Sequence, residues 1–396
     1  MNIQIVQRTL PLWPCFLGAL SFSAWGVGND NNVSPRAGEG MLNVQLTDSP
    51  ACGYNSVNVT VDRVQISPAG TGWTTIPVDS SVGRIDLLSL TNGMVVTLGQ
   101  APLPAGTYQQ VRLVLKKNES TEPWANSVVL TGAATETPLK SPSGQQNVYK
   151  IIGPFTVQEG RLTDLVLDFH SCKSIVMAGK SGQYLLKPVV TAIAKDASGS
   201  ISGKTLANSR VFAQQQSTSG PVIVKGTVAD SNGAFTLAYM ESGSTVDVVV
   251  VPPPTDGRAA AIVQNVPVAT GAITNIGDIN QAPSTIHMVS GTVTIKASGS
   301  SVAANLEAEQ TITSTNRTYV ITSTITDTGP YSISLAASGP WVGTYSTALP
   351  ILLTKDTVTS DAGIYSITAT DGLGYSSTKQ ANVSKGQTSL DFNLGR

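Results

Sequence analysis

The chain has 396 residues, and because a single hydrophobic core rarely grows beyond about 250–300 residues, this length predicts two or three domains. Charged residues make up only 12% of the sequence and the formal net charge is -1, so the sequence lacks the basic stripe that nucleic-acid binding requires. Glycine (37 residues) and proline (22 residues) are abundant, and this composition favours strands and turns over helices.

The first 26 residues have the pattern of a signal peptide. Arg8 supplies a positive charge, the run from Thr9 to Trp25 is apolar, and Ala24 and Gly26 are small residues suited to a cleavage site. A buried N-terminal strand or helix is the alternative interpretation. Since no other apolar run is long enough to cross a bilayer, we expect an exported protein without a membrane span, located in the periplasm, the cell envelope or the extracellular space.

A polar linker over residues 27–39 precedes the first strand pattern. From residue 40 onward, short runs of alternating apolar residues such as Val57-Val59-Val61 are separated by turn signals such as Thr91-Asn92-Gly93, a pattern that predicts a β-sandwich over residues 40–196. The alternation slips by one residue at Asp62-Arg63, which predicts a β-bulge. One short helix fits near Ile85 to Leu90.

Two later segments, residues 197–283 and 284–396, share turns in the same order. An Asp-x-x-Gly-x-aromatic turn ends at Phe235 in the first segment, and its counterpart ends at Tyr331 in the second. The same kind of turn occurs once more at residues 361–365, so the second copy is expected to contain an insertion. The expected fold class is all-β, with tandem β-sandwich modules of immunoglobulin-like or transthyretin-like type and little helix.

Residues 40–195 resemble an exported bacterial and archaeal family, the domain-of-unknown-function 4382 family. The resemblance is carried by LNVQLTDSPACGYNSVNVTVDRVQI, RIDLLSLTNGMVVTLGQAPLPAGTYQQVRLVL, LVLDFHSCKSIV and YLLKPVV. It implies a β-sandwich and export, and it supplies no activity. The two later segments are similar to carboxypeptidase-regulatory-like, transthyretin-type sandwiches, which implies spacer or binding modules.

Many members of the first family are lipoproteins, but Trp25 stands where the lipidated cysteine would be. We therefore expect no lipid anchor and a mature N-terminus near residues 25–27. Cys15 lies within the signal, which leaves Cys52 and Cys172 as an even pair in an exported chain. This pair predicts one disulfide, with two buried free thiols as the alternative.

The sequence offers no catalytic set, so we expect a protein that is not an enzyme and that has no cofactor and no metal site. The only histidines are His170 and His287, and no G-x-S-x-G motif accompanies them. Zinc would need about four ligands, and the Asn29–Asn32 cluster lacks the frame of a calcium loop. Five aspartates are candidate acids for glycoside hydrolysis, but they are expected at the surface or in turns: Asp48, Asp62, Asp86, Asp164 and Asp168.

Three tryptophans, Trp73, Trp124 and Trp341, are expected in loops or at loop edges, where a ring stacks on a ligand or closes one end of a sandwich core. The leading hypothesis is an exported, non-catalytic structural or binding protein of the bacterial cell envelope, whose partner is an envelope or extracellular protein or a glycan. One alternative is a carbohydrate-binding or adhesive surface protein that uses Trp73 and Trp124. Another is a hydrolase within the first domain, using His170.

Overall fold

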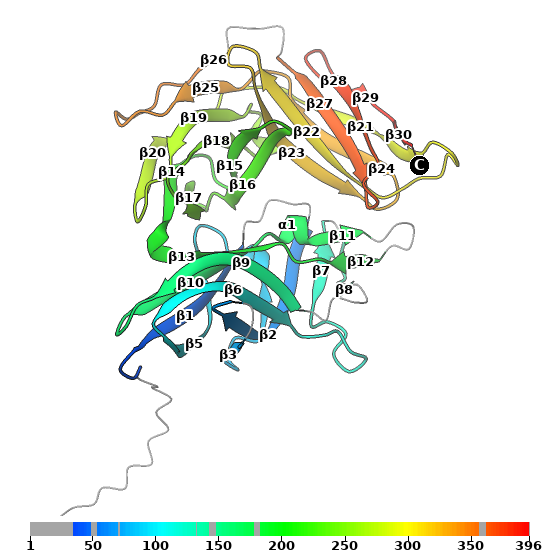
Figure 1. Ribbon diagram of the computed structural model, residues 1–396. Coiled ribbons are helices and arrows are strands. Elements are labelled where there is room, and N and C mark those ends of the chain that lie inside the picture. The colour runs from blue at the N-terminus through cyan, green and yellow to red at the C-terminus, as the bar shows by residue number, and fades with distance from the viewer. Residues whose placement is uncertain are drawn as a thin grey trace, which may run out of the picture. The chain divides into compact units, whose positions relative to one another are not determined.

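Strands form nearly all of the regular structure in the computed structural model, which describes residues 35–48, 54–69, 72–131, 133–141, 148–177, 183–355 and 362–395. The described residues all belong to one compact unit. Its only α-helix within those ranges is the four-residue α1 (Ser171–Ser174), and the remaining helical turns are the 3-10 helices η1 (Leu87–Ser89), η3 (Lys195–Ala197) and η4 (Pro254–Asp256). The all-β fold class is confirmed, and the sheets pack as sandwiches (Figure 1).

The first module, β1 to β13, consists of two sheets. The smaller has the order β13-β10-β1-β5 and contains β1 (Glu39–Asp48), β5 (Val96–Pro104), β10 (Leu162–Phe169) and β13 (Val190–Ala194). The larger has the order β11-β12-β8-β7-β2-β6-β9, with β3 and β4 also paired to β2. Its strands are β2 (Tyr54–Ser67), β3 (Thr74–Pro77), β4 (Arg84–Asp86), β6 (Gly106–Leu115), β7 (Ser127–Leu130), β8 (Thr137–Lys140), β9 (Val148–Val157), β11 (Ile175–Met177) and β12 (Tyr184–Leu186).

The second module, β14 to β20, follows the first after η3 alone. Its smaller sheet has the order β17-β14-β20, and its larger sheet begins β16-β15-β18-β19. The strands are β14 (Ser198–Lys204), β15 (Arg210–Ser217), β16 (Gly220–Val228), β17 (Ala234–Glu241), β18 (Thr245–Val251), β19 (Ala261–Pro267) and β20 (Ile273–Asp278).

The third module has the same pairing pattern as the second. Its sheets have the orders β24-β21-β29, with β30 also on β21, and β23-β22-β27-β28. The strands are β21 (Ile286–Ile295), β22 (Ala304–Ile312), β23 (Arg317–Thr326), β24 (Pro330–Ala336), β27 (Ile364–Asp371), β28 (Ser376–Asn382), β29 (Thr388–Ser389) and β30 (Phe392–Leu394). In both modules the first strand pairs antiparallel with the fourth and parallel with the last, so the two segments share one topology.

An insertion separates β24 from β27 and leaves the third module. It contains β25 (Trp341–Thr344) and β26 (Thr354–Lys355). β25 pairs in parallel with β19, so these strands extend the larger sheet of the second module to the order β16-β15-β18-β19-β25-β26. Ile351 of the insertion is buried in the core of the second module. The predicted domain boundaries remain predictions, and the insertion belongs by its pairing to the preceding module.

The larger sheet of the second module is buried on both faces. Val248 and Val250 lie in the core of that module, whereas Val249 and Val251 lie in the core of the third module. Neighbouring residues of a strand point to opposite faces, so a sheet between two cores needs apolar residues on both sides. This explains the unbroken valine run of β18 and makes the second and third modules share packing.

Two local predictions within the first module agree with the structure. The register of β2 against β6 shifts between Val61 and Arg63, which confirms the β-bulge at Asp62. The short helix expected near residues 85–90 is present as η1, where the Asp86 side chain accepts a hydrogen bond from the Leu88 amide.

Candidate functional site

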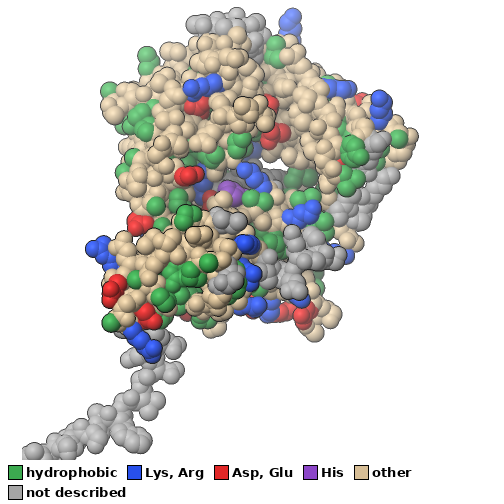
Figure 2. Space-filling view, viewed as in Figure 1, with side chains coloured by type: hydrophobic (Ala, Val, Ile, Leu, Met, Phe, Trp, Pro, Cys, Tyr) green, Lys and Arg blue, Asp and Glu red, His purple; other side chains and the backbone are tan. Residues whose placement is uncertain are grey.

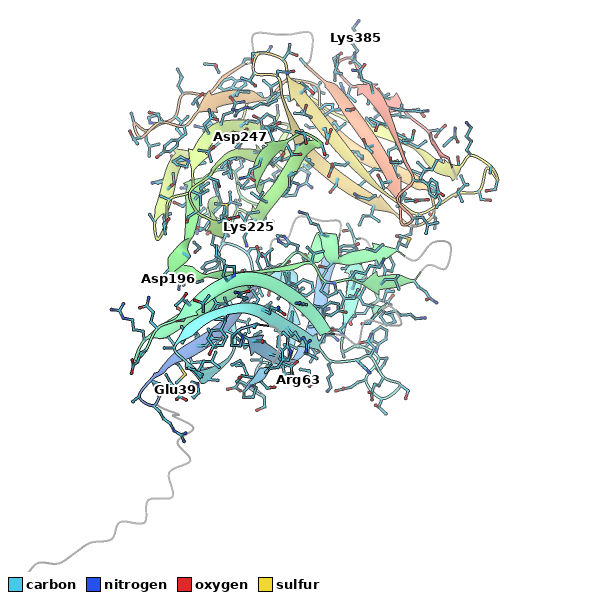
Figure 3. All side chains as sticks on the ribbon, in the orientation of Figure 1. Glu39, Arg63, Asp196, Lys225, Asp247 and Lys385 are labelled. Atoms are coloured by element: carbon cyan, nitrogen blue, oxygen red, sulfur yellow. The ribbon has the colours of Figure 1, made fainter. Side chains whose placement is uncertain are left out.

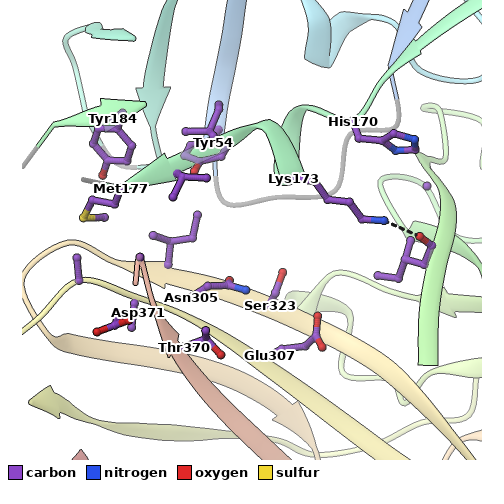
Figure 4. Close-up of a pocket in the computed structure, with 18 of the residues that line it drawn as sticks. Tyr54, His170, Lys173, Met177, Tyr184, Asn305, Glu307, Ser323, Thr370 and Asp371 are labelled. Atoms are coloured by element: carbon purple, nitrogen blue, oxygen red, sulfur yellow. Dashed lines mark hydrogen bonds between the residues drawn. The ribbon is translucent and has the colours of Figure 1, made fainter. Parts of the chain in front are cut away.

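A cavity of about 440 Å³ lies where the three modules meet, and we call it the inter-module cavity. The first module contributes α1 and β11, the second contributes β16, and the third contributes the outer face of β22, β23 and β27 (Figure 4). Figure 2 shows a hollow in the surface with a histidine side chain inside it. A volume of this size falls within the range of small-molecule sites.

The floor of the cavity follows from strand alternation in the third module. Leu306 and Ala308 of β22 point into the core and are fully buried, so Asn305 and Glu307 point outward into the cavity. On the neighbouring β23, Ser323 lies opposite Glu307. The floor therefore presents an amide, a carboxylate and a hydroxyl from adjacent strands.

The walls are mainly apolar. Ile175 and Met177 of β11 form one side, and Ile223 of β16 forms another. Ile325 continues the apolar surface from β23, and the Tyr54 ring closes the cavity beyond β11. A body without polar groups would therefore fit between the walls, and a polar group would fit against the floor.

Glu307 and Asp371 are the two acidic groups that line the cavity, and Glu307 is half-buried. Burial and the neighbouring carboxylate of Glu309 raise the pKa of Glu307, while Lys173 acts in the opposite direction. Within the described residues, the Glu307 carboxylate has no hydrogen bond and no ion pair. Lys173 already has a partner, because its ammonium donates to the backbone oxygen of Ile223 at 3.1 Å, as the dashed line in Figure 4 shows.

A buried ion pair lies beside the cavity. Lys225 of β16 donates through Nζ to Oδ2 of Asp168 of β10 at 2.7 Å, and each side chain is only 5% exposed. Lys225 is labelled in Figure 3. His170 stands next to this pair, and burial lowers its pKa, partly offset by Asp168. A second cavity of about 980 Å³ shares His170, Lys173 and Lys225 with the first, so the hollow continues along β16.

The turn after η1 makes a second contact between the first and second modules. Asn92 has a positive φ of 55°, and its side-chain oxygen accepts hydrogen bonds from the Thr227 hydroxyl at 3.0 Å and from the Thr236 amide at 3.0 Å. Its side-chain nitrogen donates to the backbone oxygen of Val228 at 3.0 Å. The Asn92-Gly93 turn signal of the sequence is thus also a docking element.

The second and third modules are joined by a further set of buried polar contacts. Asp247, labelled in Figure 3, accepts from Arg317 at 2.9 and 3.0 Å and from the Tyr319 hydroxyl at 2.9 Å. The Gln214 side chain donates to and accepts from the backbone of Val320, at 2.7 and 3.0 Å. Buried polar groups that satisfy one another in this way hold two surfaces in a single register.

The three tryptophans considered for ligand stacking, Trp73, Trp124 and Trp341, lie in different surroundings. The Arg112 guanidinium lies 3.7 Å from the centre of the Trp73 ring, so one face of that ring is covered. Trp124 is 44% exposed in a turn, as the sequence predicted. Trp341 begins β25 and is half-buried, so it belongs to a strand edge.

The five aspartates considered as acids for glycoside hydrolysis differ in burial and in their partners. Asp48 and Asp168 are 2% and 3% exposed, so the prediction of surface or turn positions was wrong for both. Asp48 accepts from the Ser171 amide at 3.0 Å and hydroxyl at 2.8 Å, which ties the first residue of α1 to the end of β1. Asp62 pairs with Arg63 at the surface, as expected. Asp86 accepts from the Leu88 amide, and Asp164 accepts from the Asn43 side chain on the neighbouring strand β1.

Other predictions concern parts that the structure leaves out. The signal peptide, the Asn29–Asn32 cluster and Cys52 lie outside the described residues, as does the side chain of Cys172, so the disulfide stays a prediction. His287 is described, but it does not line the inter-module cavity. Its Nδ1 contacts the backbone oxygen of Val383 at 2.6 Å.

The described part of the chain contains no group of three or more His, Cys, Asp or Glu side chains placed to hold a metal ion. None of its helices has the length and apolar character needed to cross a membrane. Of the residues that line the inter-module cavity, the sequence analysis singled out His170 and missed Lys173, Ile223 and Glu307, because these three share no motif.

Comparison with solved structures finds chains of low similarity. The Bacillus anthracis TIE protein is 9% identical, with a TM-score of 0.19 over 90% of this chain and 51% of that one, so this chain spans about half of its length. A double mutant of the shaft pilin SpaA from Lactobacillus rhamnosus GG is 8% identical, with a TM-score of 0.18 over 50% of this chain and 97% of that one. The Streptococcal ancillary pilin is 9% identical, with a TM-score of 0.17 over 90% and 99%.

Likeness at this level carries no argument about function. The search of curated proteins returned no match. The resemblance to carboxypeptidase-regulatory-like sandwiches stays a prediction. For the first module the predicted resemblance is confirmed, since residues 39–188 match the family model described as "Domain of unknown function (DUF4382)".

Proposed function

We propose that the protein is an exported, non-catalytic structural protein of the bacterial cell envelope, in which three sandwich modules act as one rigid body. The observation that carries this proposal is the buried ion pair between Asp168 of the first module and Lys225 of the second, with both side chains 5% exposed. Modules that move independently expose the groups between them to water, whereas this pair is sealed away from it.

Three further features support rigidity. The connection from β13 to β14 is the short helix η3, with no flexible linker between them. The second and third modules share a core, and β25 extends the sheet of the preceding module. A spacer needs this kind of fixed geometry, because it must hold what lies at its two ends at a constant separation.

Export is supported by the signal pattern of the first 26 residues. The full chain is to be expressed in a bacterium, followed by cell fractionation and intact-mass measurement. We expect mature protein in the periplasmic or secreted fraction, beginning near residues 25–27 and without an acyl mass increment. Retention in the cytoplasm with an intact N-terminus would contradict export, and an acyl increment would contradict the unlipidated form.

Rigidity and the absence of activity need separate tests. Small-angle scattering of the purified protein should fit a single conformation, and a broad distribution of particle dimensions would rule out the rigid body. A screen with esterase, glycosidase and peptidase substrates should find no turnover. Turnover that disappears in His170→Ala would establish the hydrolase alternative instead.

A second candidate function is glycan binding, which the 44% exposure of Trp124 favours. An exposed indole ring supplies a flat apolar face for a sugar ring. A glycan array should then show binding that Trp124→Ala abolishes. Trp73→Ala is the matched control, because Arg112 covers one face of that ring. An array without reproducible binding would remove this candidate.

A further inference from the structure

The inter-module cavity combines an apolar interior with one acidic group that lacks a partner. From this geometry we infer that the cavity binds a small amphipathic organic cation, with its ammonium group at Glu307 and its apolar body between β11 and β16. This inference goes beyond a structural role and depends only on the cavity that the assembled modules enclose.

The balance of charge in the cavity favours a cation. Lys225 is neutralised by Asp168, which leaves one ammonium, that of Lys173, against two further carboxyl groups that line the cavity, Glu307 and Asp371. The Lys173 ammonium donates to the Ile223 backbone oxygen, and Asp371 accepts from the amides of Leu373 and Tyr375. Glu307, by contrast, makes no hydrogen bond or ion pair within the described residues, and Glu309 lies near enough to act on it. A half-buried carboxylate without a partner is costly, and an incoming ammonium group would remove that cost.

The polar floor and the apolar walls together set the shape of the ligand. Asn305 and Ser323 flank Glu307 and offer two further acceptors for an ammonium group (Figure 4). Ile175, Met177 and Ile325 line the space beyond them. A ligand with a charged end and an apolar end therefore matches the cavity better than a sugar or an inorganic ion, which would leave the apolar walls without contact.

Three ligands with the same phenyl body test the sign of the charge. Phenethylamine is a cation, phenylalanine is a zwitterion and hydrocinnamate is an anion near neutral pH. Their binding to the full chain is measured by ligand-observed NMR and by calorimetry. We expect phenethylamine to bind most tightly. Tighter binding of phenylalanine or hydrocinnamate, or no binding of phenethylamine by folded protein, would overturn the inference.

Variants identify the group that holds the cation. Glu307→Gln keeps the size of the side chain and should weaken phenethylamine binding about tenfold, as expected for loss of a hydrogen bond to a charged group. Glu309→Gln is the matched control, because Glu309 lies on the same strand and does not line the cavity. An equal loss in both variants would show unspecific attraction and refute the site.

Lys173→Met separates a cation site from a zwitterion site. For a cation, removal of this positive charge should tighten phenethylamine binding, because a repulsion is lost. If the cavity instead holds a zwitterion, Lys173 would bind its carboxylate, and the variant would weaken phenylalanine binding. That second result would overturn the inference. Circular dichroism and the melting temperature show that each variant is folded, so a loss of binding is read only from folded protein.

Discussion

The ion pair between Asp168 and Lys225 provides a direct test of how the first and second modules are joined. Asp168→Asn preserves the shape of the side chain and removes its charge, which leaves the Lys225 ammonium buried without a counter-charge. In the native pair, Nζ of Lys225 and Oδ2 of Asp168 are 2.7 Å apart and both side chains are 5% exposed, so water screens their attraction very little. Removal of one partner from such a pair typically costs about 3–5 kcal/mol, and we expect a loss of this size.

Urea unfolding followed by tryptophan fluorescence and by circular dichroism measures this change. Lys225→Met should be less destabilising than Asp168→Asn. The Asp168 carboxylate that stays behind has another contact, whereas Asp168→Asn leaves the buried Lys225 ammonium without a counter-charge. The double variant Asp168→Asn/Lys225→Met should recover most of the loss, since no uncompensated charge is left. If Asp168→Asn changes the free energy of unfolding by less than about 1 kcal/mol, the range of an exposed pair, the reasoning from burial is wrong.

Three other predictions concern backbone and pH. Gly160→Ala introduces a Cβ into open space at a φ of 66°, and it should lower the free energy of chemical unfolding by about 1–2 kcal/mol. Gly233→Ala has a similar φ of 80° but places its Cβ 1.9 Å from the Thr205 backbone oxygen, so it should destabilise the protein far more. Burial lowers the pKa of His170, so an NMR titration should find a pKa below the usual 6.5. The stability that depends on the neutral ring is present at pH values above 6.5 and is lost as the pH falls through the lowered pKa. Burial raises the pKa of Glu307, so the folded state favours its protonated form; Glu307→Gln should raise the melting temperature at neutral pH, and the difference should vanish as the pH falls below the ordinary glutamate value. An unchanged melting temperature at neutral pH would contradict the burial of that carboxylate.

Local pattern in the sequence predicted those features that depend on neighbouring residues. The slip of alternation at Asp62 predicted the bulge, because alternation records which face of a strand is buried. The turns that end at Phe235 and Tyr331 predicted two equivalent positions where an aromatic ring anchors the start of a strand, and both rings are buried at the start of β17 and β24. These features need no knowledge of distant parts of the chain.

Contacts between modules could not be predicted in the same way. Asp168 stands in the half of β10 where every residue is buried, and nothing near it in the sequence indicates that Lys225 will neutralise it. Glu307 looks like an ordinary outward-facing residue of β22, and only the packing of β11 and β16 above it turns that face into the floor of a cavity. Such groups carry a signal only in three dimensions, because their partners lie far away along the chain.

The path of the insertion also bears on how the chain must fold as it is made. Synthesis delivers the second module before the third, yet β19 acquires its neighbour β25 only after residue 344 has appeared, and Ile351 covers the core later still. Until then β19 has an open edge, which is a template for pairing with another chain. A protein shortened to end at residue 283 would keep that open edge permanently. The second module is therefore incomplete as a separate unit. Its correct folding waits for β25 and Ile351, which the sequence places after β21 to β24 of the repeat that follows.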